Sequence, residues 1–259
     1  MANLRYEWRR ITTVRATWIL TGCSVLVAAL LAEILALTIG ALGDPQMQGL
    51  SGATSDGHAL TQDKFPLELF VIGSAGSFVT LILLGVVSAQ SFGQEYRHGT
   101  IRLTLTMFPR RGPVFAAKVI VTGAVIISAY VAAMIAAVLV ALPNGKVVEV
   151  TIDGSFLAGI GRAVLFMLGF SLIVLAITLL TRILALGVII PIVLALIVEP
   201  LLSALASYEW ASVMIKALPF MSGSAFTQGQ DLLRNGLVFF GWTVVLLAVS
   251  LVTFQKRDA

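Results

Sequence analysis

QSFGQEYRHGTIRLTLTMFPRRGPVFAAK, residues 90–118, is the stretch that decides the topology of this chain. It contains four arginines and ends on Lys118. Its charges, which begin at Glu95, separate uncharged runs of 26 residues (Leu69–Gln94) and 27 residues (Val119–Gly145). A segment with this many charges cannot lie in hydrocarbon. We therefore expect it to form a loop between two membrane spans, in contact with the cytosol or with another protein.

The composition excludes a soluble protein. Of the 259 residues, 58% are hydrophobic and only 12% are charged, whereas soluble domains carry about 25% charged residues. The mean hydropathy is +0.99. The pI near 9.5 does not indicate nucleic-acid binding, because the basic residues lie in short loops and at the N-terminus, as in membrane proteins. With one cysteine, Cys23, and two histidines, we expect neither an intrachain disulfide nor a metal site.

Hydropathy predicts an all-α integral membrane protein with six transmembrane helices. Each apolar run is close to or above the ~20 residues that a spanning helix needs. The expected spans are 18–42, 67–90, 114–142, 155–180, 183–202 and 236–254. Only Thr181 and Arg182 separate the fourth span from the fifth, so these two form a tight antiparallel hairpin. All 259 residues are expected to form one transmembrane domain.

The distribution of basic residues predicts the orientation. Of 17 lysines and arginines, this topology places twelve on one side and four on the other, with Arg162 inside the membrane. The positive-inside rule makes the side with twelve cytoplasmic, so both termini are expected in the cytoplasm of a cell whose plasma membrane holds the protein. Residues 91–113 then form a cytoplasmic loop, and residues 43–66 and 143–154 are external. Residues 203–235 are expected to form short external helices at the interface.

The N-terminal residues 1–17 carry four arginines and one acid, Glu7. Leu4, Trp8, Ile11 and Arg15 recur at helical spacing, which favours an interfacial helix on the cytoplasmic leaflet. The alternative is a basic tail that does nothing but set the orientation.

The sequence lacks the motifs of the common enzyme classes. No G-x-x-x-x-G-K-[ST] phosphate loop, H-E-x-x-H or G-x-S-x-G occurs. The chain is therefore not expected to hydrolyse ATP or to be an enzyme. No pair of helices interrupted at matching positions indicates a secondary transporter.

A short amphipathic helix is expected inside the cytoplasmic loop. Ile101, Leu105 and Phe108 recur at helical spacing, after Gly99 and before Pro109. The alternation in TIRLTLT (residues 100–106) would suit a strand, but a lone strand in a short loop has no partner for its backbone. Burial of the three apolar side chains in a groove of a partner protein would make this helix a docking element.

The loop resembles a known family. Its motif residues follow the E-x(3)-G-T…P-x-R…K pattern of ABC-2 type exporter permeases: Glu95, Gly99, Thr100, Leu103, Pro109, Arg110 or Arg111, and Lys118. The resemblance implies six spans, an N-terminal interfacial helix and a coupling helix between spans 2 and 3. That helix would dock on a separate ATPase subunit, present in two copies and carrying ATP and Mg²⁺. A second permease chain, identical or different, would complete the complex, and this chain itself would hold no cofactor.

The individual loop residues have alternative roles. Gly99 either permits a bend or takes part in docking, and Pro109 is expected to end the helix. Arg110 and Arg111 are either positive-inside anchors or ATPase contacts, and the pattern leaves open which arginine matters. Glu95 is expected to cap a helix or form a salt bridge that sets the angle of the coupling helix.

The function expected from the resemblance is ATP-driven export of a hydrophobic or amphipathic substrate such as a drug, peptide or lipid. Two other classes stay open: a secondary transporter or channel without an ATPase, and a membrane immunity or sensor subunit that binds an amphipathic peptide. The sequence does not identify the substrate.

Three charges fall within the predicted spans: Glu33, Arg162 and Glu199. At 1.5 Å per residue, each reaches a similar depth, near the outer edge of a ~30 Å hydrocarbon core. Each could snorkel independently to the headgroups. The alternative is an ion pair between Arg162 and Glu199, because the hairpin holds spans 4 and 5 side by side, with Glu33 joining them or facing the substrate path.

Overall fold

The computed structural model describes residues 2–42, 64–108, 110–205 and 214–256. It is 86% helical, and six helical segments in it are long and apolar enough to cross a membrane. These are α2 (Arg15–Leu42), α5 (Phe78–His98), α7 (Arg111–Ala141), α8 (Gly154–Thr181), the unit formed by α9 (Leu184–Val193), η1 (Leu194–Val198) and α10 (Glu199–Ala204), and α13 (Leu232–Lys256). The prediction of an all-α protein with six spans is confirmed.

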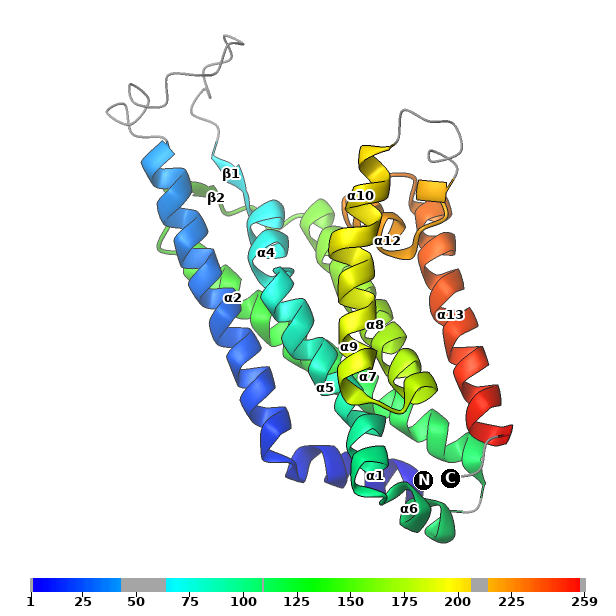
Figure 1. Cartoon of the computed structure of the whole chain (residues 1–259). Coiled ribbons are helices and arrows are strands. Elements are labelled where there is room, and N and C mark those ends of the chain that lie inside the picture. Colours follow the sequence, from blue (N-terminus) through cyan, green and yellow to red (C-terminus); the bar gives the residue numbers. More distant parts are fainter. Residues whose placement is uncertain (1, 43–63, 109, 206–213, 257–259) are drawn as a thin grey trace.

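The helices form an elongated bundle (Figure 1). Helices α1 (Ala2–Thr13) and α6 (Ile101–Met107) lie at one end, here named the α6 end, and α10 and α12 (Pro219–Thr227) lie at the other, the α12 end. The last turn of α13 returns to the α6 end, where α1 also lies. Helix α2 forms one flank of the bundle and α13 the other.

Helix α1 (Ala2–Thr13) lies across the α6 end and leads directly into α2 (Arg15–Leu42). The N-terminal helix predicted over residues 1–17 thus ends at Thr13. At this corner the Trp18 indole N–H donates to the Thr12 carbonyl at 2.7 Å. Ala28, Ala32 and Ala36 form the buried stripe of α2. Their small side chains suit the close packing of α2 along α7 (Arg111–Ala141).

The second span is interrupted near one end. Helix α4 (Leu67–Ala75) stops before Gly76, and α5 (Phe78–His98) begins after Ser77, whose hydroxyl accepts the Thr80 N–H at 3.4 Å. Helix α5 continues well beyond Gln90, so residues 91–98 of the predicted loop are helical. Gly99 ends α5 with φ of 66°, a left-handed conformation that glycine adopts without steric cost.

Two loops at the α12 end are joined by a minimal parallel sheet. Strand β1 (Phe65–Pro66) pairs with β2 (Val148–Glu149), with Phe65 opposite Val148. Asp153 then caps α8 (Gly154–Thr181) by accepting the Phe156 N–H at 2.9 Å. Through this sheet, the backbone of Val148 and Glu149, which follow α7, gains a partner strand.

Helices α8 and α9 (Leu184–Val193) form the predicted tight hairpin, with Arg182 in the left-handed region at φ of 60°. Gly187 lies against Thr178, where a Cβ atom would be only 1.8 Å from the threonine hydroxyl. Beyond Pro191, the span passes through one π-helical turn, η1 (Leu194–Val198), into α10 (Glu199–Ala204).

The remaining elements close the bundle. Helix α12 (Pro219–Thr227) is a short helix in the predicted 203–235 segment, of which residues 206–213 lie outside the described ranges, and α13 (Leu232–Lys256) is the sixth span. The main core runs along the bundle. A separate second core at the α6 end consists of Phe92, Ile101, Phe115, Leu175, Leu179 and Phe254.

Candidate functional site

Four charged side chains from three helices meet at the α6 end and are here named the charged cluster. They are Glu7 and Arg10 of α1, Glu95 of α5 and Lys118 of α7. Lys118 Nζ lies 2.9 Å from Oε1 of both Glu7 and Glu95. Arg10 Nη1 lies 3.1 Å from Glu7 Oε2 and 2.6 Å from Glu95 Oε1. Each base therefore contacts both acids.

The charged cluster is buried and formally neutral. The Lys118 side chain is 0% exposed, those of Glu7 and Glu95 are 2% exposed, and that of Arg10 is 19% exposed. The carbonyl of Ser91 accepts from Lys118 Nζ at 3.3 Å and from Arg10 Nη2 at 3.2 Å. Buried charges of this kind tolerate the loss of a partner poorly, because the remaining charge stays away from water. The network therefore holds α1, α5 and α7 in one relative arrangement.

The charged cluster also reaches helix α6 (Ile101–Met107). Thr104 donates its hydroxyl to Glu95 Oε1 at 3.4 Å. That oxygen thus contacts Arg10, Lys118 and Thr104, while Glu95 Oε2 has no hydrogen-bond partner among the described residues. Glu95 therefore forms the salt bridge that was expected of it. Its contact with Thr104 also joins it to α6, the helix whose angle it was predicted to set.

The inner face of α6 packs on this chain. Ile101 is only 4% exposed and belongs to the second core, and Leu105 packs against that core. Phe108 stacks on Tyr6 of α1, with ring centroids 5.7 Å apart. The prediction that Ile101 is open to a partner is therefore wrong, whereas Leu105 and Phe108 are only partly buried and their docking role stays a prediction. The periodicity found the apolar face correctly, but that face covers the chain's own core.

The outer face of α6 carries a different apolar pair. Leu103 is 64% exposed and Met107 is 56% exposed, and the i, i+4 spacing places them side by side. Arg102 and Thr106 are exposed next to them. This face is available to another protein.

The other predicted loop residues have separate roles. Gly99 and Thr100 form the turn between α5 and α6. Arg111 donates to the carbonyls of Phe254 and Gln255 at 3.0 and 3.2 Å, which ties the start of α7 to the end of α13. Arg110 is exposed. Pro109 lies outside the described residues. Of the two arginines, Arg111 therefore has a clear structural role.

The sequence matches a family model described as "ABC-2 family transporter protein" over residues 4–201, which is 198 of the 259 residues. The chain belongs to this family. The match includes the whole charged cluster and α6, and it ends within α10. A comparison with curated proteins found no match.

At the α12 end, this ABC-2 family protein carries three further charged side chains: Glu68, Arg162 and Glu199. Arg162 of α8 pairs with Glu68 of α4, with Nη2 and Oε1 3.0 Å apart, and donates from Nε to the Thr227 carbonyl at 3.2 Å. Glu199 instead accepts the backbone N–H groups of Phe220, at 3.0 Å, and Met221, and so caps α12.

The predicted ion pair between Arg162 and Glu199 is therefore wrong. The hairpin does place α8 beside the α9–α10 unit, but the rotation of each helix directs Arg162 toward α4 and α12 and Glu199 toward α12 alone. Glu33 is exposed and accepts from Asn144 Nδ2 at 3.4 Å. Among the described residues, no group of three His, Cys, Asp or Glu side chains is arranged to hold a metal ion.

Sequence reasoning about this ABC-2 protein missed four members of the ion-pair networks. Glu7 and Arg10 were noted only as charges of the N-terminal segment, Lys118 only as a motif residue at the end of the loop, and Glu68 not at all. Glu68 and Lys118 had a signal, since each borders an uncharged run and a charge there is costly unless it is paired. The pattern does not say which partner it takes.

Proposed function

We propose that this chain is the permease subunit of an ATP-driven ABC exporter in the plasma membrane, with both termini in the cytoplasm. It works with two copies of a separate ATPase, which carry ATP and Mg²⁺, and with a second permease chain. The observation that supports this most strongly is the geometry of α6. An exposed Leu103–Met107 pair lies on a helix whose opposite face is fixed to the bundle.

Force applied to α6 has a short path into the spans. Ile101 joins α6 to the second core, and Thr104 joins it to Glu95. From Glu95 the contacts divide toward α1 through Arg10 and toward α7 through Lys118. Closure of the ATPase dimer on ATP would push α6, and the three helices joined by the charged cluster would move with it. The substrate is hydrophobic or amphipathic, in keeping with the apolar spans.

The test uses the outer face of α6. Each fully buried apolar side chain contributes about 1.5–3 kcal/mol to association. Leu103→Asp should therefore weaken binding of the partner ATPase by at least about tenfold. The matched control is Leu142→Asp, because Leu142 is similarly exposed, at 54%, and lies at the opposite end of α7.

The measurement is the yield of ATPase that co-purifies with each variant at equal membrane insertion, together with ATP-dependent substrate transport. We expect Leu103→Asp to lose both and Leu142→Asp to keep the ATPase. Wild-type complex yield and transport in Leu103→Asp would contradict α6 as the coupling helix.

A further inference from the structure

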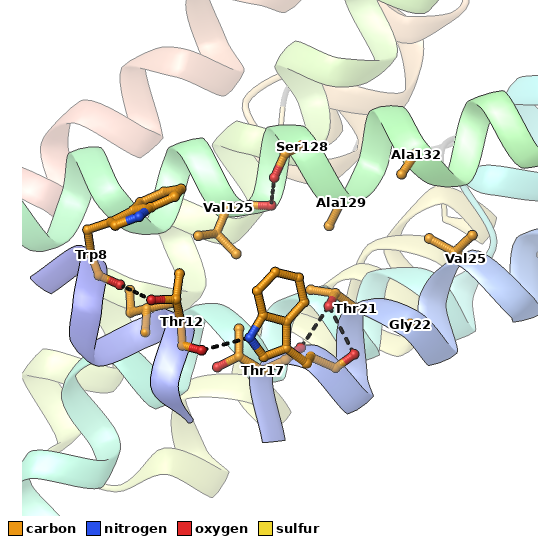
Figure 2. Close-up of a pocket in the computed structure, with 12 residues that line it drawn as sticks. Trp8, Thr12, Thr17, Thr21, Gly22, Val25, Val125, Ser128, Ala129 and Ala132 are labelled. Atoms are coloured by element: carbon orange, nitrogen blue, oxygen red, sulfur yellow. Dashed lines mark hydrogen bonds between the residues drawn. The ribbon is translucent and has the colours of Figure 1, made fainter. Parts of the chain in front are cut away.

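An apolar hollow of about 320 Å³ opens between α1, α2 and α7 (Figure 2). Trp8 and Trp18 both line it, and Val25, Val125, Ala129 and Ala132 supply much of the remaining wall. Its volume falls at the lower end of the ~300–1,000 Å³ range of small-molecule sites. None of the described residues that line it is charged.

Three hydroxyls in this wall already have acceptors. Thr12 donates to the Trp8 carbonyl at 2.8 Å, Thr21 to the Thr17 carbonyl at 2.8 Å, and Ser128 to the Val125 carbonyl at 2.9 Å (Figure 2). A hydrocarbon occupant would leave these three donors with their acceptors. The hollow therefore suits an alkyl chain better than a polar ligand.

Shared lining residues link the hollow, step by step, to two neighbouring surface features. Trp8 also lines an apolar groove between α1 and α7, together with Leu4, Ile120 and Ala124. Arg5 lies on that groove and also on a surface hollow that includes Arg9. The shared residues thus place two arginines near the apolar hollow.

Arg5 and Arg9 are available to a ligand. Both are exposed, and neither forms an ion pair with another residue of the described ranges, whereas Arg10 is engaged in the charged cluster. Their i, i+4 spacing places them on one side of α1. Tryptophans beside arginines are typical of the boundary between headgroups and hydrocarbon.

We propose that this composite site binds an anionic phospholipid of the leaflet on which α1 lies. One acyl chain fills the hollow between Trp8 and Trp18, and the phosphate lies against Arg5 and Arg9. The charge of the two arginines and the apolar interior together select a lipid that is anionic rather than zwitterionic. This inference does not depend on the ATPase or on the transported substrate.

The first test measures tryptophan quenching by lipids brominated on the acyl chains. The full chain is reconstituted with Trp210 and Trp242 replaced by Phe, so that the two emitting tryptophans, Trp8 and Trp18, both line the hollow. Each arginine near an anionic surface is worth about a fivefold change in lipid partition. We expect brominated phosphatidylglycerol to displace phosphatidylcholine from the site with a preference of more than about fivefold. Arg5→Gln/Arg9→Gln should reduce it to near unity.

The matched control is Arg97→Gln, which removes an exposed arginine from α5, outside the hollow and its adjoining groove and surface. It should keep the preference. Equal quenching by both brominated lipids in the parent protein would overturn the proposal. So would an anionic preference that survives in Arg5→Gln/Arg9→Gln, since it would reflect general attraction of the lipid to a basic protein.

The second test fills the hollow. A Cβ atom added at Gly22, which lines the hollow, meets nothing within 4 Å, so Gly22→Leu adds a side chain there from a position with space at its Cβ. Gly241→Leu is the control, because a Cβ at Gly241 also meets nothing within 4 Å and Gly241 lies on α13, away from the site. We expect Gly22→Leu alone to reduce the tryptophan quenching by chain-brominated lipid. Unchanged quenching in Gly22→Leu would overturn the assignment.

Discussion

Replacing Lys118 by Met removes a positive charge from a site in which two carboxylates lie 2.9 Å from its Nζ atom. The remaining side chains are Glu7, Glu95 and Arg10, with a formal charge of −1 where the intact charged cluster is neutral. Loss of one partner from a buried ion pair typically costs about 3–5 kcal/mol of folding free energy. Arg10 still contacts both acids, at 3.1 and 2.6 Å, so we expect the lower end, about 3 kcal/mol.

The double variant tests whether unbalanced charge is the cause. Glu95→Gln alone leaves a charge of +1 in the charged cluster. Lys118→Met combined with Glu95→Gln restores neutrality, with Glu7 and Arg10 still paired at 3.1 Å. We therefore expect the double variant to cost less than the sum of the two single variants, by at least about 1 kcal/mol.

The assay is equilibrium unfolding of the purified chain in mixed micelles, followed by tryptophan fluorescence. Lys146→Met is the control, because Lys146 is exposed and its loss should change stability by less than about 0.5 kcal/mol. The reasoning would be refuted if Lys118→Met were as stable as Lys146→Met, or if the costs of Lys118→Met and Glu95→Gln were strictly additive.

Two further predictions test contacts at other places in the bundle, and a third tests the proposed orientation in the membrane. A double-mutant cycle on Glu68 and Arg162 should give a coupling energy above about 0.5 kcal/mol, whereas a cycle on Arg162 and Glu199 should give none. Coupling between Arg162 and Glu199 without coupling between Glu68 and Arg162 would contradict the observed pairing. Gly187→Ala should destabilise the α8–α9 hairpin by about 1–3 kcal/mol in a thermal melt, because its Cβ would overlap Thr178, whereas Gly161→Ala, which meets no atom within 4 Å, should not. In a Cys23→Ser background, Lys146→Cys should react with an impermeant thiol reagent from outside intact cells and Arg97→Cys only after permeabilisation; labelling of Arg97→Cys in intact cells would contradict the proposed orientation.

Hydropathy predicted the spans well because the thickness of the membrane sets the length of each apolar helix. Five of the six observed spans begin within four residues of the predicted start. The second span is the exception. Its apolar run is continuous from Leu69, but the chain bends at Gly76 and Ser77 before α5 begins. A hydroxyl that caps a helix inside an apolar run is a local feature that averaged hydropathy does not resolve.

The partners of charged residues were not predictable in the same way. Spacing along one helix reports a shared face, which is how Ile101, Leu105 and Phe108 were grouped correctly. It does not report how far each helix is rotated toward its neighbours. That rotation directs Arg162 to Glu68 and Glu95 to Lys118. A single sequence contains the charges but not the rotations that pair them.

The short length of α6 explains why its inner face is occupied. A helix of seven residues has little stability of its own, so tertiary contacts must fix its orientation. Ile101 in the second core, Thr104 on Glu95 and Phe108 on Tyr6 provide contacts near its start, middle and end. These contacts use one face, which leaves Leu103 and Met107 on the other. The residues that pack on the chain itself are thus the ones that hold the proposed docking face in place. Such rigidity would suit the proposed coupling role, because a helix that yields under load would absorb the push before it reached the spans.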